Sequence, residues 1–292
     1  MRLVTFTHHG STRLGVLNGD SITDLSRAAP ELPTEMNAFL SAGEAAMDAA
    51  RAATGDDIAL KDVTLLSPVS KPGKILAVAL NYRDHLEEVQ EAMPDFPTPQ
   101  TPMLFTKQNS SVTGPFAPIY LPPESEQLDY EAELAIVIGK TCRRVPKSRA
   151  HEVIAGGMVA NDVSIRDWQL ASQTMTMGKS WDSHCPMGPA LVTPDEFDMA
   201  NIDFTCSVNG ETRQSSNTGL LVFDIPTLIN YLSTVCTLHP GDVILTGTTS
   251  GVAPWMDGQP WLKEGDVVTC DFGALGKIEN KVETDPVGTV IG

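Results

Sequence analysis

The first 65 residues alternate apolar and polar side chains in the way that is typical of short strands. Val4 and Phe6 fall on one side of an extended chain, and turn residues follow at Gly10 and at positions 18–20. This pattern predicts antiparallel strands joined by tight turns. Residues 39–53 are rich in alanine and predict one helix that continues through Gly43 and ends at Gly55.

Beyond residue 70, the apolar runs have the length of strands. The predicted strands cover residues 75–80, 134–138, 190–192, 204–208, 243–245 and 267–270. Helical patterns are fewer and cover residues 84–93, 148–156, 163–173 and 225–234, whereas residues 178–189 read as a loop. This mixture predicts a strand-rich α+β fold and argues against a doubly wound α/β sheet.

A segment rich in proline and glycine at residues 67–73 is the best candidate for a domain boundary. It predicts a small N-terminal α+β domain over residues 1–68. The larger domain would then cover residues 69–292.

Charge narrows the choice of partners. The chain has 20 basic and 37 acidic residues, a net charge of −17. Such a surface repels nucleic acid and anionic lipid, so a small molecule is the expected partner. An anionic substrate would then need a local positive charge, and a bound divalent cation is one way to supply it.

Cysteine usage and the N-terminus predict a cytoplasmic protein. The five cysteines form no CxxC pair, which is typical of reduced thiols. The N-terminus lacks the apolar core of a secretory signal, and the longest apolar run, roughly six residues, is too short for a membrane span. The motifs GxGxxG, GxxxxGK[ST], GxSxG and HExxH are absent, which disfavours dinucleotide, P-loop, serine-hydrolase and zinc-protease chemistry.

Glu131 and Glu133 are the first candidate site. In an extended strand, two residues at this spacing point to the same face. Two adjacent carboxylates repel each other, and a hard cation with oxygen ligands would relieve that repulsion. The alternative is that both glutamates face water on a solvated sheet, which spacing alone favours.

A second candidate follows at Asp162, Arg166 and Gln169. On a helix these three side chains would share one face. An acid beside an arginine and an amide suits a site that holds a cation and an anionic ligand together, because arginine binds carboxylates bidentately. The alternatives are a helix N-cap at Asp162 and an ordinary surface ion pair.

Three weaker signals complete the candidates. His85 and Glu88 would be neighbours on a helix, where the carboxylate could orient the imidazole as a general base. Lys179 follows a glycine and could direct a cation at an anionic intermediate. Thr248 lies in a segment of glycines and hydroxyls that could bind a carboxylate. The alternatives are a polar helix face, a solvated lysine and a plain turn.

The order of these motifs resembles the fumarylacetoacetate hydrolase family over residues 74–282, and within it the branch of acylpyruvate hydrolases and oxaloacetate decarboxylases. The matching segments are LNYRDH (80–85), PMLFTK (102–107), LPP (121–123), DYEAE (129–133), NDVSIRD (161–167), GKSWD (178–182), CPMGP (185–189), QSSNT (214–218) and PGDVILTGT (240–248). The resemblance implies a strand-rich roll, a small N-terminal domain and a homodimer.

The resemblance also implies roles for the candidate residues. The implied ligands of Mg²⁺ or Mn²⁺, with Ca²⁺ in some members, are Glu131, Glu133 and Asp162. The implied catalytic groups are His85, Glu88 and Lys179. His85 and Glu88 would lie on a segment that closes over the substrate, and Lys179 would lie in a loop. The implied substrate contacts are Tyr82, Arg166, Gln169 and Thr248.

The implied reaction is the metal-dependent hydrolysis of a C–C bond in a β-diketo acid of the acylpyruvate type, a small anionic 2-oxo acid. His85 would activate the attacking water, and Lys179 would stabilise the developing negative charge. Alternatives on the same site are oxaloacetate decarboxylation, isomerisation of a hydroxy-dienoate, and hydrolysis or dehydration of a deoxy-sugar acid. A non-catalytic binding protein is disfavoured because the dyad and the metal set are complete.

The sequence departs from the family pattern in two places. Thr249 stands where many members have proline, and the stretch 255–261 is peculiar to this chain. Both departures concern the shape of the substrate pocket and leave the metal ligands intact.

Overall fold

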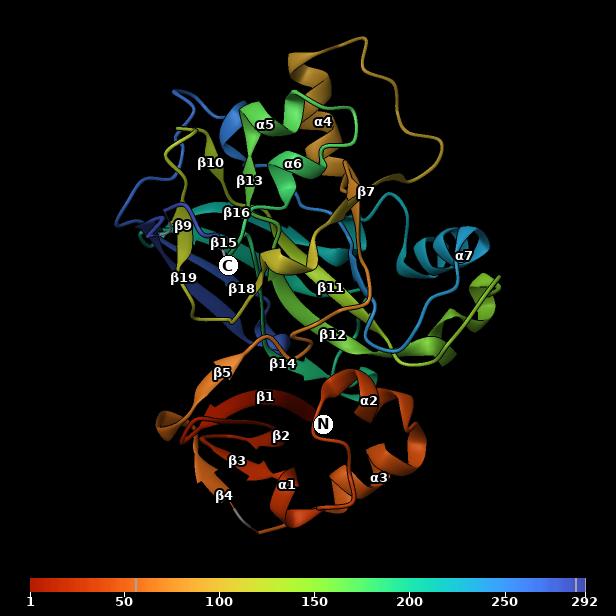
Figure 1. Cartoon of the computed structure of the whole chain (residues 1–292). Helices are drawn as coiled ribbons and strands as arrows, with labels where there is room; N and C mark the ends of the chain where they lie inside the picture. The colour runs from red at the N-terminus through yellow and green to blue at the C-terminus, as the bar shows by residue number, and fades with distance from the viewer. Residues whose placement is uncertain (56, 287, 292) are drawn as a thin grey trace.

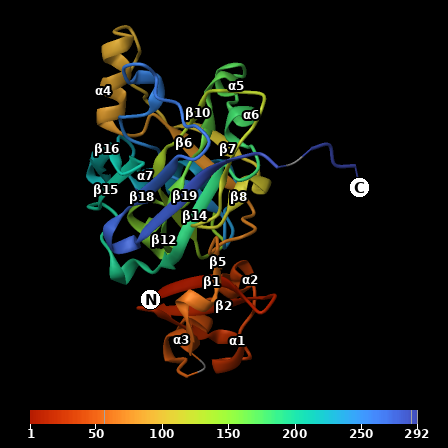
Figure 2. The same cartoon turned by 90° about the vertical axis from the view of Figure 1, so that its left-hand side faces the viewer.

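The computed structural model describes residues 1–55, 57–286 and 288–291. The N-terminal segment, red and orange in Figure 1, forms a layer at one end of the molecule. Helices α4 (Arg83–Ala92), α5 (Arg166–Leu170) and α6 (Thr176–Lys179) gather at the opposite end. Figure 2 shows the same separation after a turn of 90°.

The N-terminal segment contains the antiparallel strands that its alternation predicts. They are β1 (Arg2–His8), β2 (Ser11–Asn18), β3 (Ser21–Asp24), β4 (Asp57–Ala59) and β5 (Thr64–Leu66). Helix α1 spans Leu25–Ala28. The prediction of one helix over residues 39–53 is wrong: α2 (Met36–Ser41) and α3 (Glu44–Ala52) are separate, because Gly43 adopts a φ of +76° that an α-helix cannot contain.

A large mixed sheet crosses the whole molecule in the order β4-β3-β2-β1-β14-β12-β11-β17-β6-β7, with β5 on β1 and β8 on β14. Its other strands are β6 (Ile75–Ala79), β7 (Met103–Lys107), β8 (Val112–Thr113), β11 (Ala132–Ile138), β12 (Ile154–Asn161), β14 (Cys185–Val192) and β17 (Val243–Leu245). Because β1 pairs with β14 at Leu3 and Leu191, the N-terminal segment shares this sheet with the rest of the chain. The domain boundary at residue 68 stays a prediction.

A second sheet packs against the first in the order β16-β15-β18-β19-β9, and β10 pairs with β13 separately. The strands are β9 (Ile119–Leu121), β10 (Leu128–Asp129), β13 (Ser164–Ile165), β15 (Asp203–Val208), β16 (Glu211–Asn217), β18 (Val267–Asp271) and β19 (Lys277–Thr284). Helix α7 spans Ile225–Val235. The predicted strand-rich α+β class is confirmed.

Strand β11 is buried on both faces and separates two parts of the core. Leu134 and Ile136 join the cluster that includes Phe204 of the second sheet. Ala135 and Val137 point the other way, into a cluster that includes residues of α2 and α3. Since both faces are apolar, any charged side chain at the start of β11 enters the protein interior.

Three local predictions are wrong. Residues 148–156 form a 3₁₀ helix (Lys147–Val153) and then enter β12, and residues 163–173 contain β13 before the short helix α5. Residues 178–189, expected to be a loop, contain the end of α6 and the start of β14. The other 3₁₀ helices span Leu60–Asp62, Asn109–Ser111, Pro194–Glu196, Thr218–Leu220, Ala253–Trp255 and Gly273–Leu275. In the described part of the chain, no helix is both long and apolar enough to cross a membrane.

Candidate active site

Three carboxylates meet where β10, β11 and β12 come together. Glu131 lies in the short break between β10 and β11. Ala132 pairs with Asn161, and the amide of Asp162 therefore donates to the Glu131 carbonyl at 2.8 Å. One carboxylate oxygen from each of Glu131, Glu133 and Asp162 lies within 4.8 Å of the others. Non-local strand pairing thus assembles the predicted ligand set.

Burial of these carboxylates excludes the alternative of a solvated sheet face. Glu131 is 6% exposed, Glu133 1% and Asp162 0%. Burial, together with the nearby Asp162 and Glu131, raises the pKa of Glu133 well above its usual value. Three buried oxygen donors that repel one another match the preference of Mg²⁺ or Mn²⁺, so the residues present fit a hard divalent cation.

Gly247 completes the surroundings of Glu133. Its amide donates to Glu133 Oε2 at 2.6 Å. It has a φ of +101°, and a Cβ there would approach the Val78 carbonyl oxygen to 2.9 Å. Only glycine brings the backbone this close.

Three cationic side chains form ion pairs with two of these carboxylates, Glu131 and Asp162. Lys179 Nζ lies 2.7 Å from Glu131 Oε2 and 2.9 Å from Asp162 Oδ2. Lys107 Nζ lies 2.5 Å from Asp162 Oδ1, and Arg166 Nη1 lies 2.5 Å from Glu131 Oε1. Although burial by itself would raise the pKa of Glu131, Lys179 and Arg166 lower it to about 2. Sequence reasoning missed Lys107, for which the PMLFTK segment was the only signal.

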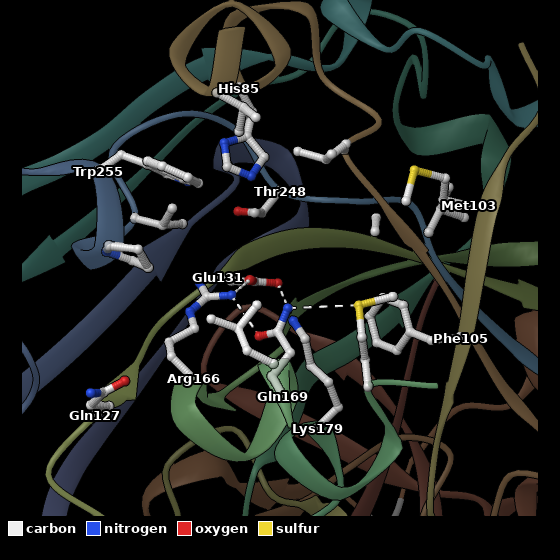
Figure 3. Close-up of a pocket in the computed structure, with 18 of the residues that line it drawn as sticks. His85, Met103, Phe105, Gln127, Glu131, Arg166, Gln169, Lys179, Thr248 and Trp255 are labelled. Atoms are coloured by element: carbon white, nitrogen blue, oxygen red, sulfur yellow. Dashed lines mark hydrogen bonds and ion pairs between the residues drawn. The ribbon is translucent and has the colours of Figure 1, made fainter. Parts of the chain in front are cut away.

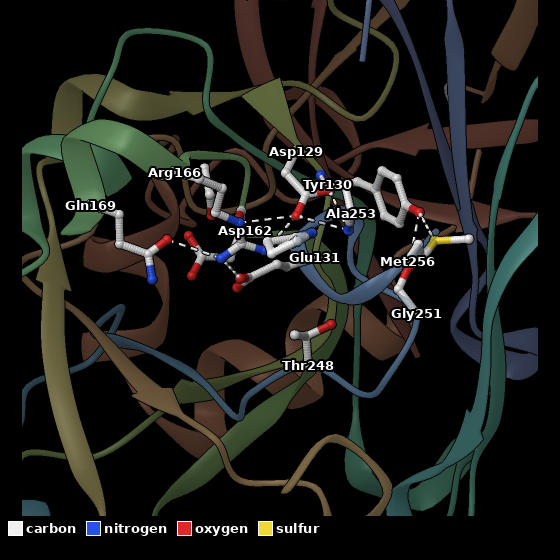
Figure 4. Close-up of polar contacts among 12 residues, drawn as sticks. Asp129, Tyr130, Glu131, Asp162, Arg166, Gln169, Thr248, Gly251, Ala253 and Met256 are labelled. Carbon is white, nitrogen blue, oxygen red and sulfur yellow. Dashed lines mark hydrogen bonds and ion pairs between the residues drawn. The ribbon is translucent and has the colours of Figure 1, made fainter. Parts of the chain in front are cut away.

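Asp129 anchors Arg166 from behind and was also missed. It is fully buried and accepts hydrogen bonds from Arg166 Nε at 2.9 Å and Nη2 at 2.6 Å (Figure 4). Burial raises the pKa of Asp129 although Arg166 opposes the rise. Arg166 Nη1 also donates to Gln169 Oε1 at 2.9 Å. The guanidinium is therefore fixed between two carboxylates and an amide.

The predicted dyad is formed on α4. His85 Nδ1 lies 2.8 Å from Glu88 Oε2, and the other oxygen of Glu88 accepts from the Gly251 amide at 2.9 Å. Asp84 Oδ2 accepts from the hydroxyls of Ser216 and Thr249, each at 2.6 Å. The helix that carries the imidazole is thus held at its first turn and along its length.

One member of the dyad, His85, and one carboxylate of the cluster, Glu131, line a common cavity of about 540 Å³. In Figure 3, His85 enters from one side, Glu131, Arg166 and Lys179 lie opposite, and Thr248 lies between them. Gln169 also lines the cavity. This size is in the range of small-molecule sites, and the arrangement places a potential base across from a cationic and metal-binding floor.

Two predicted substrate contacts have other partners. The Thr248 hydroxyl donates to the Ala132 carbonyl at 3.0 Å and accepts from Gln214 at 2.9 Å. Tyr82 is fully buried against Phe204, with ring centroids 5.6 Å apart, and is not among the described residues that line the cavity. The structure thus brings Thr248 to the cavity and leaves Tyr82 in the core.

The expected helix face from Asp162 to Gln169 is wrong in part. Helix α5 begins at Arg166, and its N-cap is Ile165, so Asp162 precedes the helix and does not cap it. Arg166 and Gln169 do share a face of α5. Asp162 reaches the site instead through the end of β12.

Comparisons with known proteins agree with this geometry. Residues 74–283 match the family described as fumarylacetoacetate (FAA) hydrolase C-terminal, and residues 1–68 match the one described as Rv2993c-like, N-terminal. The oxaloacetate tautomerase FAHD2A, mitochondrial, of Bos taurus is 42% identical over 292 residues, covering 97% of this chain and 91% of the bovine protein.

Solved structures extend the comparison. A fumarylacetoacetate hydrolase from Exiguobacterium antarcticum superposes with a TM-score of 0.85 at 35% identity, covering 98% of this chain and 100% of that one. Maleylpyruvate hydrolase from Sphingobium sp. SYK-6, in complex with manganese(II) ion and pyruvate, gives a TM-score of 0.79 at 32% identity, covering 97% and 99%. These named relatives are enzymes, and the chain belongs to the fumarylacetoacetate hydrolase family.

Proposed function

We propose that this protein is a divalent-metal-dependent hydrolase that cleaves a C–C bond in an acylpyruvate-type β-diketo acid. The products would be a carboxylic acid and pyruvate. The observation that carries the proposal is that one cavity is lined both by His85, which is paired with Glu88, and by Glu131, which clusters with Glu133 and Asp162. A base that faces a metal-binding floor suits the attack of water on a bound 2-oxo acid.

The floor of the cavity would bind the 2-oxo acid end. Glu131, Glu133 and Asp162 would hold Mg²⁺ or Mn²⁺, and when bound this ion supplies a Lewis acid for the α-keto acid oxygens. Lys179 lies against two of these carboxylates and would stabilise the negative charge that develops as the C–C bond breaks. The cation therefore offsets, locally, the net charge of −17.

The roof of the cavity would supply the base. Glu88 would accept a hydrogen bond from His85 Nδ1–H. The other ring nitrogen, Nε2, would then take a proton from water. That water adds to the distal carbonyl, the C–C bond breaks, and the pyruvate enolate takes up a proton. The α4 helix covers the site and would limit the access of bulk water.

A substrate panel with Mg²⁺ or Mn²⁺ tests this proposal. We expect pyruvate release from an acylpyruvate, loss of that activity on chelation, and a reduction by about 10²- to 10⁴-fold in His85→Gln. The exposed His151→Gln is the matched control. Full hydrolytic activity in His85→Gln with unchanged substrate binding would show that another group is the base.

A second candidate is oxaloacetate chemistry on the same enolate, either tautomerisation or decarboxylation. It is favoured by the name of the bovine relative, which is 42% identical over nearly the whole chain. Neither reaction requires an attacking water. Turnover of oxaloacetate without turnover of any acylpyruvate would favour this candidate over the hydrolase.

We further propose a cytoplasmic homodimer, as the family resemblance implies. Leu170 of α5 and Met177 of α6 are 83% and 60% exposed, which suits an interface with a second copy. Light scattering should then give a mass of twice 31.3 kDa. A mass of one chain at micromolar concentration would contradict the dimer.

A further inference from the structure

The cavity has apolar walls above a polar floor. Val89 and Met93 lie one and two helical turns beyond His85, along the same side of α4 and at its end. Phe96 follows, and Met103 and Phe105 of β7 line the cavity beside them. Figure 3 shows Met103 and Phe105 on the side of the cavity away from Trp255. The base and an apolar wall therefore share one helix.

This wall offers no charged partner to a second carboxylate. Among the described residues that line the cavity, the basic side chains are His85, Arg166 and Lys179. Arg166 and Lys179 already contact buried carboxylates, and His85 contacts Glu88. A carboxylate at the far end of a substrate would lose part of its hydration against methionine and phenylalanine and would gain no ion pair there, which is unfavourable.

The cavity is also larger than a four-carbon diacid requires. A volume of about 540 Å³ corresponds to roughly eighteen water-sized volumes of about 30 Å³ each. The stretch 255–261 contributes Trp255, Gln259 and Trp261 to the lining. The volume of the cavity and the apolar side chains that line it thus favour a substrate with an extended uncharged part.

We propose that the wall formed by Val89, Met93, Phe96, Met103 and Phe105 binds the acyl group of the substrate, and that this group is an uncharged alkyl or aryl chain. The inference rests on the proposed function, because it assigns the substituent of the carbonyl that water attacks. A water held by His85 places that carbonyl next to α4, and the substituent then runs along Val89 toward Met93. Dicarboxylates such as fumarylpyruvate and oxaloacetate are disfavoured by the same wall.

A homologous series measured with Mg²⁺ tests the assignment. From acetylpyruvate to 2,4-dioxooctanoate, kcat/KM should rise by about fourfold for each added methylene, or about 60-fold in all, in proportion to the apolar area buried. Fumarylpyruvate should be at least about 100-fold poorer than 2,4-dioxooctanoate.

A matched pair of variants on β7 locates the effect. Met103 and Leu104 are 38% and 37% exposed, but only Met103 lines the cavity among the described residues. Met103→Arg should shift the preference toward fumarylpyruvate by at least about tenfold, whereas Leu104→Arg should leave it unchanged. Circular dichroism checks that both variants are folded. If Met103→Arg does not fold, the milder Met103→Gln takes its place, and it should reduce the gain in kcat/KM for each added methylene.

The outcomes separate this inference from the proposed function. Hydrolysis of acetylpyruvate with no gain from a longer chain, or with fumarylpyruvate preferred, would overturn the apolar acyl site and leave the hydrolase standing. An equal shift in the Met103 and Leu104 variants would also overturn it. Failure to hydrolyse any acylpyruvate would overturn both proposals.

Discussion

Two of the carboxylates proposed to bind the metal, Glu131 and Asp162, belong to a network of buried ion pairs. Their cationic partners are Lys107, Arg166 and Lys179. Each of these three side chains exposes less than a tenth of its surface. Each charge in these ion pairs is therefore stabilised by its oppositely charged partners, and removal of one member leaves a buried charge unpaired. The predicted ligands and the two missed residues, Lys107 and Asp129, form one electrostatic unit.

Replacement of one carboxylate ligand by a neutral amide should weaken metal binding. Glu133→Gln keeps the size of the side chain and the contact with Gly247 but cannot supply the anionic carboxylate that a bound cation would stabilise. We expect Mn²⁺ affinity, measured by isothermal titration calorimetry, to fall by about 100-fold or more. The exposed Glu126→Gln should bind Mn²⁺ as the unmodified protein does. Equal affinities in the two variants would place the ion elsewhere.

Asp129 should matter for stability because it is the buried partner of Arg166. Asp129→Asn removes the charge that faces two guanidinium nitrogens and should lower the free energy of unfolding by about 3–5 kcal/mol. Urea denaturation measures this change, with the exposed Asp182→Asn as control. A midpoint that does not move would mean that Arg166 is satisfied by Glu131 and Gln169 alone.

At the scale of elements, α4 depends on contacts that come from distant parts of the chain. Its first turn is bound through Asp84 to β16 and to the segment after β17, and Glu88 is bound to Gly251. The Thr249 hydroxyl donates one of these hydrogen bonds. The position of His85 is therefore set by the 246–251 segment as well as by its own helix.

Loss of the Thr249 hydroxyl should loosen α4. Thr249→Val conserves shape and leaves Asp84 Oδ2 with one donor fewer, at a cost of about 1–3 kcal/mol. Hydrogen exchange of the α4 amides should become faster, and kcat should fall more than substrate binding weakens. Thr234→Val, at an exposed site on α7, serves as the control. Unchanged exchange on α4 would show that Ser216 suffices.

At the scale of the whole molecule, one buried histidine links folding to pH. His184 is fully buried, and Nε2 lies 2.8 Å from the Tyr120 carbonyl oxygen. Burial lowers the pKa of His184 from 6.5 to about 3, against the opposing effect of this hydrogen bond. The unfolded chain therefore binds a proton between these values that the folded chain does not bind.

This difference predicts an acid-sensitive term in stability. The contribution of His184 is fully present above pH 6.5 and is lost as the pH falls toward 3, by up to about 5 kcal/mol. Urea unfolding of His184→Gln and of the exposed control His151→Gln between pH 4.5 and 7 measures it. The slope of stability against pH should be reduced in the His184 variant alone; parallel slopes would contradict the prediction.

Local pattern determined part of this protein. Strands at residues 243–245 and 204–208 and the helix at 225–234 follow from short-range periodicity, because burying one face needs only the right alternation. The ordered motifs also identified Glu131, Glu133, Asp162, His85 and Glu88 as one set. They did so through resemblance, since spacing alone favoured a solvated surface.

Tertiary structure decided the rest, because the deciding contacts join residues far apart in the chain. Glu131 and Glu133 are buried because β11 lies between β12 and β17 and has apolar layers on both faces. Asp129 and Lys107 acquire partners 37 and 55 residues away, and the apolar wall combines α4 with β7. No local period encodes such pairings, so the charge network and the shape of the cavity emerge only when the sheets are assembled.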